Sequence, residues 1–307
     1  MISHRNLRRL ITALAVTVTG AVLPGGVAQA DESGRPPQIL YYNHAYDVLD
    51  RQTADAIENS AYLRDFASFE VRTTTGGGMT WKGRYLKGRE TYLELFAVGD
   101  LPGSDGEFGA AGMGLSTEHA GDLATVRQRL TDQGVTPVDY RQTRDFGDGV
   151  PVPWFDTTRA VSSYQAFDGW AMEYLPEYFA DPRSATEPAS YEGDVSRERY
   201  LPDDYQNHLM RDVAAIRIGV TSTDLAATVP LLKAGGFQLT TLSDGSVIAS
   251  GGGTTVRYDN VPREQAGLKQ VVFTLNRSVP RHVEQIGRSS LVAGPGATAV
   301  WTFTGTA

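Results

Sequence analysis

The 307-residue sequence contains one motif twice, and this repetition limits the folds open to the chain. The motif D-L-A-x5-L-x3-G begins at Asp122 and again at Asp224. In each copy the aspartate stands where a helix N-cap is expected, the leucines recur at helical spacing, and the glycine can end the helix. Pro230 is expected to bend or shorten the second helix. Because a strand-like run precedes each copy, the sequence predicts repeated strand–helix units.

The pattern around the motif extends each unit to one strand, one helix and two or three further strands. The first unit is expected to contain a strand at 39–49, a helix at 53–66 and strands at 67–74, 83–87 and 91–98. The second is expected to contain a strand at 112–117, a helix at 122–133 and strands at 138–143, 154–160 and 170–175. A third unit is expected at 213–261, and a shorter fourth with strands at 270–275, 289–293 and 298–303. The chain is therefore predicted to be α+β, with tandem βαβββ modules.

These units predict a division into two domains. Residues 31–180 hold the first two modules, and residues 213–307 hold a shorter, degenerate pair. The polar, proline-containing stretch 181–212 is interpreted as the connection between them.

The first 30 residues have the pattern of a secretory signal peptide. Basic residues (Arg5, Arg8 and Arg9) precede the apolar stretch 11–23, and Ala28-Gln29-Ala30 offers a small-residue cleavage site. A membrane anchor is the alternative, but the apolar stretch is short for a span and is followed by Pro24. The expected protein is secreted and extracellular, with the choice between Sec and twin-arginine export left open.

Composition excludes several functions. The chain has no cysteine, which rules out disulfides, thiol catalysis and thiolate metal ligands. Its 36 acidic residues outnumber 28 Lys and Arg. This charge argues against nucleic acid as a partner, and against a membrane partner once the signal is cleaved. The oligomeric state is left open.

Three segments carry a resemblance to a known superfamily. They are Tyr-Asn-His-Ala-Tyr-Asp-Val at 42–48, Glu-Thr-Tyr-Leu-Glu-Leu-Phe at 90–96 and Gly-Met-Gly-Leu-Ser-Thr at 112–117. With the module order, they resemble the vicinal oxygen chelate superfamily of glyoxalase-like and bleomycin-resistance-like proteins, and within it secreted glyoxalase-like proteins. The resemblance implies that paired modules form two glyoxalase-like half-open barrels.

The resemblance also implies one divalent metal ion, such as Zn, Fe, Mn or Ni. His44 and Glu94 match the ligand positions of the first module, and Glu173 matches one of the second. The fourth position falls within 112–115, which has no His, Gln or acid. The alternatives are a hydrogen-bonded strand histidine at 44 and a solvent-exposed Glu94. No metal is expected in the second domain, whose role is structural support, a partner surface or an apolar pocket.

Aromatic side chains suggest a ligand pocket in the first barrel. The residues expected to line it are Trp81, Tyr92, Trp154, Asp156 and Trp170. The first functional hypothesis is binding of a small molecule without turnover. The second is a metal-dependent lyase, isomerase or dioxygenase acting on vicinal oxygens, with Tyr92 or Asp156 handling a proton. The third is a secreted interaction module whose barrel is filled.

Overall fold

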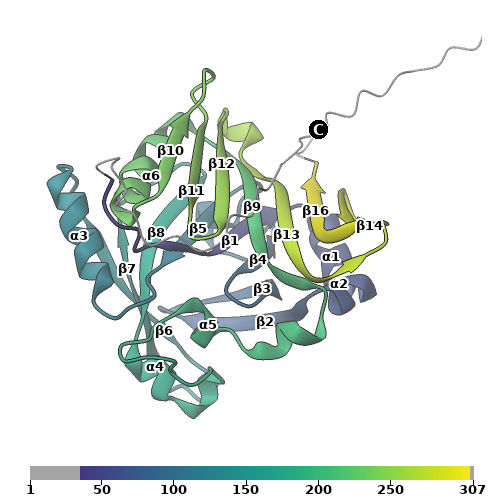
Figure 1. Cartoon of the computed structure of the whole chain (residues 1–307), viewed down its shortest axis with the longest axis horizontal. Coiled ribbons are helices and arrows are strands. Elements are labelled where there is room, and N and C mark those ends of the chain that lie inside the picture. Colours follow the sequence, from purple (N-terminus) through teal and green to yellow (C-terminus); the bar gives the residue numbers. More distant parts are fainter. Residues whose placement is uncertain (1–34, 305–307) are drawn as a thin grey trace, which may run out of the picture. The chain divides into compact units, whose positions relative to one another are not determined.

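The computed structural model describes residues 35–304, which belong to one compact unit (Figure 1). They form two eight-stranded sheets with a few helices. The predicted signal peptide lies outside the described residues, and the two-domain division stays a prediction. No helix within 35–304 is long and apolar enough to cross a membrane.

Sheet 1 contains the first two modules. Its strands are β1 (Tyr41–Leu49), β2 (Ser68–Gly76), β3 (Met79–Lys87), β4 (Tyr92–Ala97), β5 (Ala111–Ser116), β6 (Val138–Arg144), β7 (Val152–Arg159) and β8 (Phe167–Tyr174). Their order is β2-β3-β4-β1-β5-β8-β7-β6. Helices α1 (Arg51–Asn59) and α2 (Ala61–Phe66) follow β1, and α3 (Asp122–Asp132) follows β5. The two modules meet where β1 and β5 pair antiparallel.

Sheet 2 repeats this order with the last eight strands. They are β9 (Met210–Val220), β10 (Gln238–Thr241), β11 (Val247–Gly251), β12 (Thr254–Asn260), β13 (Gly267–Val279), β14 (His282–Ile286), β15 (Ser289–Ala293) and β16 (Gly296–Phe303). Helix α6 (Ser222–Gly235) follows β9, whereas β13 runs into β14 without an α-helix. The predicted α+β fold of paired modules in two barrel-like halves is confirmed. The fourth module has one strand more than predicted.

The main hydrophobic core lies between the two sheets, with helices packed into it. Phe66 of α2 meets Phe273 of β13 at a ring-centroid distance of 5.4 Å, and Phe167 of β8 meets Tyr258 of β12 at 5.6 Å. Helix α6 of the third module packs on β8 of sheet 1. Helices α1, α2 and α3 also contribute buried residues to this core, and we call the opposite face of sheet 1 the concave face.

The chain between the sheets crosses this concave face. Residues 176–207 form the short helices α4 (Pro176–Ala180) and α5 (Arg197–Tyr200), and the 3-10 turns η2 (Pro182–Ser184) and η3 (Asp203–Asn207). Two further 3-10 turns are η1 (Gly103–Gly106) and η4 (Arg263–Gln265). We call residues 176–207 the connector. It makes a second aromatic core with sheet 1, through Tyr178, Val195 and Tyr200.

Local details of the repeated helices differ from the sequence prediction. Neither aspartate is an N-cap: Asp122 follows the cap Gly121, and Asp224 lies inside a helix capped by Thr221. The motif glycines do end both helices with positive φ, 77° at Gly134 and 85° at Gly236. Helix α6 runs through Pro230 to Gly235, so Pro230 does not shorten it. The predicted helix 53–66 is divided in two, with the Ser60 hydroxyl capping the second part.

The two motif aspartates should differ sharply in their contribution to stability. The Asp224 carboxylate, 1% exposed, accepts hydrogen bonds from the backbone N–H groups of Gln165, Ala166 and Phe167 at 2.8–3.1 Å. Asp224→Ala leaves these buried donors without an acceptor and should lower the free energy of unfolding by about 3 kcal/mol or more in urea denaturation. The matched variant Asp122→Ala removes a helix-dipole interaction and should cost under about 1 kcal/mol. Equal losses would contradict this account.

Candidate functional site

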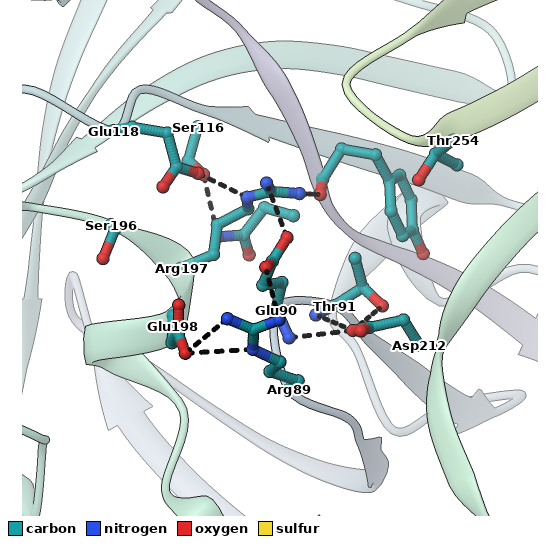
Figure 2. A network of polar contacts seen from close by, with 12 residues as sticks. Arg89, Glu90, Thr91, Ser116, Glu118, Ser196, Arg197, Glu198, Asp212 and Thr254 are labelled. Carbon is teal, nitrogen blue, oxygen red and sulfur yellow. Dashed lines mark hydrogen bonds and ion pairs between the residues drawn. The ribbon is translucent and has the colours of Figure 1, made fainter. Parts of the chain in front are cut away.

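The connector closes part of the concave face with aromatic side chains. Tyr200 stacks on Tyr174 of β8 at a centroid distance of 4.1 Å, and Leu201 is buried against Tyr85 and Tyr92. Arg197 attaches this segment to sheet 1 (Figure 2). Figure 2 also shows Arg89 bonded to Glu198 of α5 and Thr91 bonded to Asp212 of β9, so the turn before β4 is bonded both to the connector and to the strand that follows it.

A cavity of about 180 Å³ lies in the part of the concave face that the connector leaves open. Nine of its eighteen wall residues are Phe, Tyr or Trp, including Tyr46, Phe96 and Phe155. On β4, Tyr92, Glu94 and Phe96 face the cavity, while Leu93 and Leu95 between them enter the main core. This alternation follows from the period of two along a strand. A cavity of this composition suits a flat, mainly apolar ligand.

His44 reaches the cavity because of an irregularity in β1. The pairing of β1 with β5 shifts between Tyr42 and His44, so that Asn43 is an extra residue. The Asn43 side-chain oxygen lies 2.8 Å from His44 Nδ1, and the imidazole stacks on Tyr92 at 4.4 Å. Burial lowers the pKa of His44 to about 3, so the ring is neutral at ordinary pH.

Glu94 is buried in the cavity wall, 8% exposed, and the exposed alternative is wrong. Its Oε1 accepts a hydrogen bond from Trp81 Nε1 at 3.1 Å. Burial raises its pKa, while a hydrogen bond from Tyr85 and the positive charge of Arg72 act in the opposite direction. Glu94 is therefore held by neighbours on β2 and β3.

A second polar group at the cavity was not predicted from the sequence. Asp168 of β8 forms an ion pair with Arg159 Nε at 2.9 Å, and Tyr164 donates a hydrogen bond to Asp105 at 2.7 Å. All four residues line the cavity. Asp168 stands two residues before Trp170, and this spacing on one strand face is the signal that could have revealed it.

Four of the five residues expected to form the pocket lie in the cavity wall: Trp81, Tyr92, Trp154 and Trp170. The indole N–H groups of Trp154 and Trp170 are buried and have no hydrogen-bond partner among the described residues. Asp156 lies elsewhere, bound by both oxygens to Arg141 at 2.7 and 2.8 Å. A shift in the β6–β7 pairing makes Trp154 an extra residue and turns Asp156 outward, so its prediction as a pocket residue was wrong.

Glu173 does not join His44 and Glu94. Its carboxylate accepts hydrogen bonds from the Thr117 hydroxyl and from the N–H groups of Gly121 and Leu123, at 2.9–3.2 Å. It therefore stabilises the N-terminus of α3 on the other face of the sheet. Its prediction as a metal ligand was wrong because neighbouring strand residues face opposite sides.

The residues around His44 do not fit a divalent metal ion. Gly114 stands opposite His44 on β5, where a fourth ligand was sought, and a Cβ there would lie 2.7 Å from the imidazole Cε1. Gly112 likewise makes room for the rings of Tyr46 and Trp170. Among the residues from 35 to 304, no group of three His, Asp or Glu side chains could hold a metal.

Comparison with protein-family models gives a match over residues 42–303. The chain belongs to DUF5829, a family of unknown function. The match covers both sheets. Comparison with curated protein sequences finds no significant match.

One solved structure shares the fold, and two others align with lower scores. A hypothetical protein from Staphylococcus aureus aligns with a TM-score of 0.51 and 11% identity, covering 81% of this chain and 96% of that protein. The 2,3-dioxygenase LapB from Pseudomonas sp. KL28 gives a TM-score of 0.42 and 9% identity, covering 88% and 93%. A fusion of a xylose isomerase-like TIM barrel with 4-hydroxyphenylpyruvate dioxygenase gives 0.43 and 11%, covering 80% of this chain and 38% of the fusion.

The buried Asp168 should make stability fall as pH rises. Burial raises the pKa of Asp168 from 3.8 to about 6 despite Arg159, so the folded state holds a proton that the unfolded state has lost between these values. Asp168→Asn removes this dependence. The free energy of unfolding of the variant, relative to wild type, should therefore increase by up to about 3 kcal/mol from pH 3.5 to pH 7.

Asp156→Asn is the matched control for this measurement. The Arg141 guanidinium lowers the pKa of Asp156, so its ion pair stabilises the fold at neutral pH and is lost in acid. Relative to wild type, the free energy of unfolding of Asp156→Asn should therefore decrease from pH 3.5 to pH 7. The decrease should be smaller than the increase for Asp168→Asn, because the Asp156–Arg141 pair is solvent-accessible. A pH-independent difference for Asp168→Asn would contradict the assignment.

Proposed function

We propose that the concave face of sheet 1 binds a small, planar, mainly apolar molecule, without a metal ion. The observation that carries this proposal is the aromatic cavity, whose wall holds a neutral imidazole where the related fold would place a metal ligand. Its volume of about 180 Å³ resembles the roughly 150 Å³ of an engineered apolar cavity that takes up benzene. The ligand is therefore one ring or two fused rings.

Polar groups in the cavity wall restrict the chemical groups that the ligand can carry. The indole N–H groups of Trp154 and Trp170 lack protein acceptors, and a buried donor gains from finding one. Glu94 accepts a hydrogen bond from Trp81 and Asp168 is paired with Arg159, so both carboxylates have partners and the wall does not call for a charged ligand. We infer a neutral aromatic molecule with a carbonyl or hydroxyl oxygen at its edge.

The proposal includes the superfamily and the location. The paired βαβββ modules and the fold shared with solved structures support membership of the vicinal oxygen chelate superfamily. The basic, apolar and small-residue pattern of residues 1–30 supports secretion. Binding fits these observations better than metal chemistry, because Glu173 serves α3 and Gly114 offers no ligand. It fits better than a filled interaction module, because the barrel keeps a cavity.

Ligand binding is testable by thermal shift with indole, phenol and 1-naphthol. A compound present at ten times its dissociation constant stabilises the protein by about 1.4 kcal/mol, which raises Tm by about 2–4 °C for a chain of this size. The shift should persist in EDTA. Leu101 is a half-buried residue of the cavity wall. Leu101→Trp adds a bulky ring at this position, which should occupy the cavity and abolish the thermal shift.

Val98→Trp is the matched control. Val98 stands three residues earlier, is 43% exposed and lies outside the cavity wall, so its substitution should leave the shift unchanged. No shift with any of the three compounds, a shift lost in EDTA, or equal shifts in the two tryptophan variants would overturn the proposal.

A further inference from the structure

A second cavity, of about 190 Å³, lies beneath the connector. Strands β2 and β3 contribute Arg72 and Lys87, β6 contributes Arg144, and the connector contributes Arg183. Glu70 is the only carboxylate in its wall. Four cations around one small space are unexpected in a chain whose formal net charge is −8.

Three of these four cations form ion pairs with carboxylates. Glu70 Oε2 lies 3.2 Å from Arg72 Nη1 and 2.8 Å from Lys87 Nζ. Arg183 pairs with Asp181 at 2.7 Å and also with Asp148. Glu70 is thus shared between Arg72 and Lys87, and the charge of Glu94 in the aromatic cavity also acts on Arg72.

Arg144 has no carboxylate partner among the residues described. Its Nη1 donates to the Tyr178 hydroxyl, and its guanidinium carbon lies 4.5 Å from the centre of the Phe146 ring and 5.5 Å from that of Trp154. Stacking on these rings fixes the plane of the guanidinium. A held guanidinium with free N–H groups, facing further cations across a cavity, is the arrangement that binds oxyanions.

We propose that this cavity binds a tetrahedral oxyanion, a phosphate or sulfate group, either free or as the end of a monoester. Arg144 binds the oxygens through its fork of N–H groups, and Lys87 and Arg72 add positive charge from the opposite wall. This site is separate from the aromatic cavity, with which it shares only the wall residues Arg72 and Tyr92. A negative result for oxyanion binding can therefore be distinguished from a negative result for ligand binding in the aromatic cavity.

Isothermal titration with sodium phosphate, sodium sulfate and phenyl phosphate tests the proposal at low ionic strength. At least one should bind with one-to-one stoichiometry, and 0.5 M NaCl should weaken it. Preference for inorganic phosphate indicates a free ion, and preference for phenyl phosphate a monoester. Arg144→Gln should weaken binding about tenfold or more, and Arg144→Lys, which keeps the charge but not the fork, should weaken it less.

Arg141→Gln is the matched control, because Arg141 lies on the same strand and pairs with Asp156 outside the cavity. It should bind as wild type does. Leu101→Trp should also bind the oxyanion normally, since Leu101 lines the aromatic cavity alone. Absence of saturable binding by all three compounds, or equal affinity of wild type, Arg144→Gln and Arg144→Lys, would overturn the proposal.

Discussion

The buried guanidinium of Arg197 holds the connector against sheet 1, and the cavity beneath the connector depends on this attachment. Its Nε donates to Glu118 at 2.5 Å, its Nη1 to the Tyr42 carbonyl at 2.7 Å and its Nη2 to Glu90 at 3.1 Å. A buried charge is tolerated only when it is paired and hydrogen-bonded in this way. Because the three partners follow or belong to different strands of sheet 1, one side chain fixes the connector to the centre of the sheet.

Module order could be predicted from the sequence, because each helix and strand carries its own local pattern. The D-L-A motif located α3 and α6, and the segments around His44 and Glu94 located β1 and β4. The fourth module was harder to predict, since β14 has a weak apolar alternation and follows β13 after two residues. Local patterns thus predicted the helices and strands and their order along the chain.

The direction of individual side chains could not be predicted so well. Extra residues at Asn43 and Trp154 reverse the alternation of two strands, and such bulges leave no distinct mark in the sequence. Glu173 had the right residue type on the right strand and the wrong face. The role of the connector was also hidden, because its aromatic residues are sparse and their partners lie far away in the chain.

Sheet 1 and sheet 2 have the same strand order, but their outer faces, which are turned away from the main core, have different surroundings. The outer face of sheet 2 carries Arg217 and Arg257, paired with Asp259 and accessible to solvent. On sheet 1 the connector converts the corresponding face into an enclosed one. The two faces therefore differ because the connector lies over one of them.

Three of the four tryptophans, Trp81, Trp154 and Trp170, stand in the wall of the aromatic cavity. The fourth, Trp301, is fully buried in sheet 2, where its indole N–H is bonded to Ser289 at 2.9 Å. Three indole rings therefore face the cavity, whereas the fourth is shielded from it. A molecule that binds in the cavity should therefore change the emission of these three rings and leave that of Trp301 unchanged.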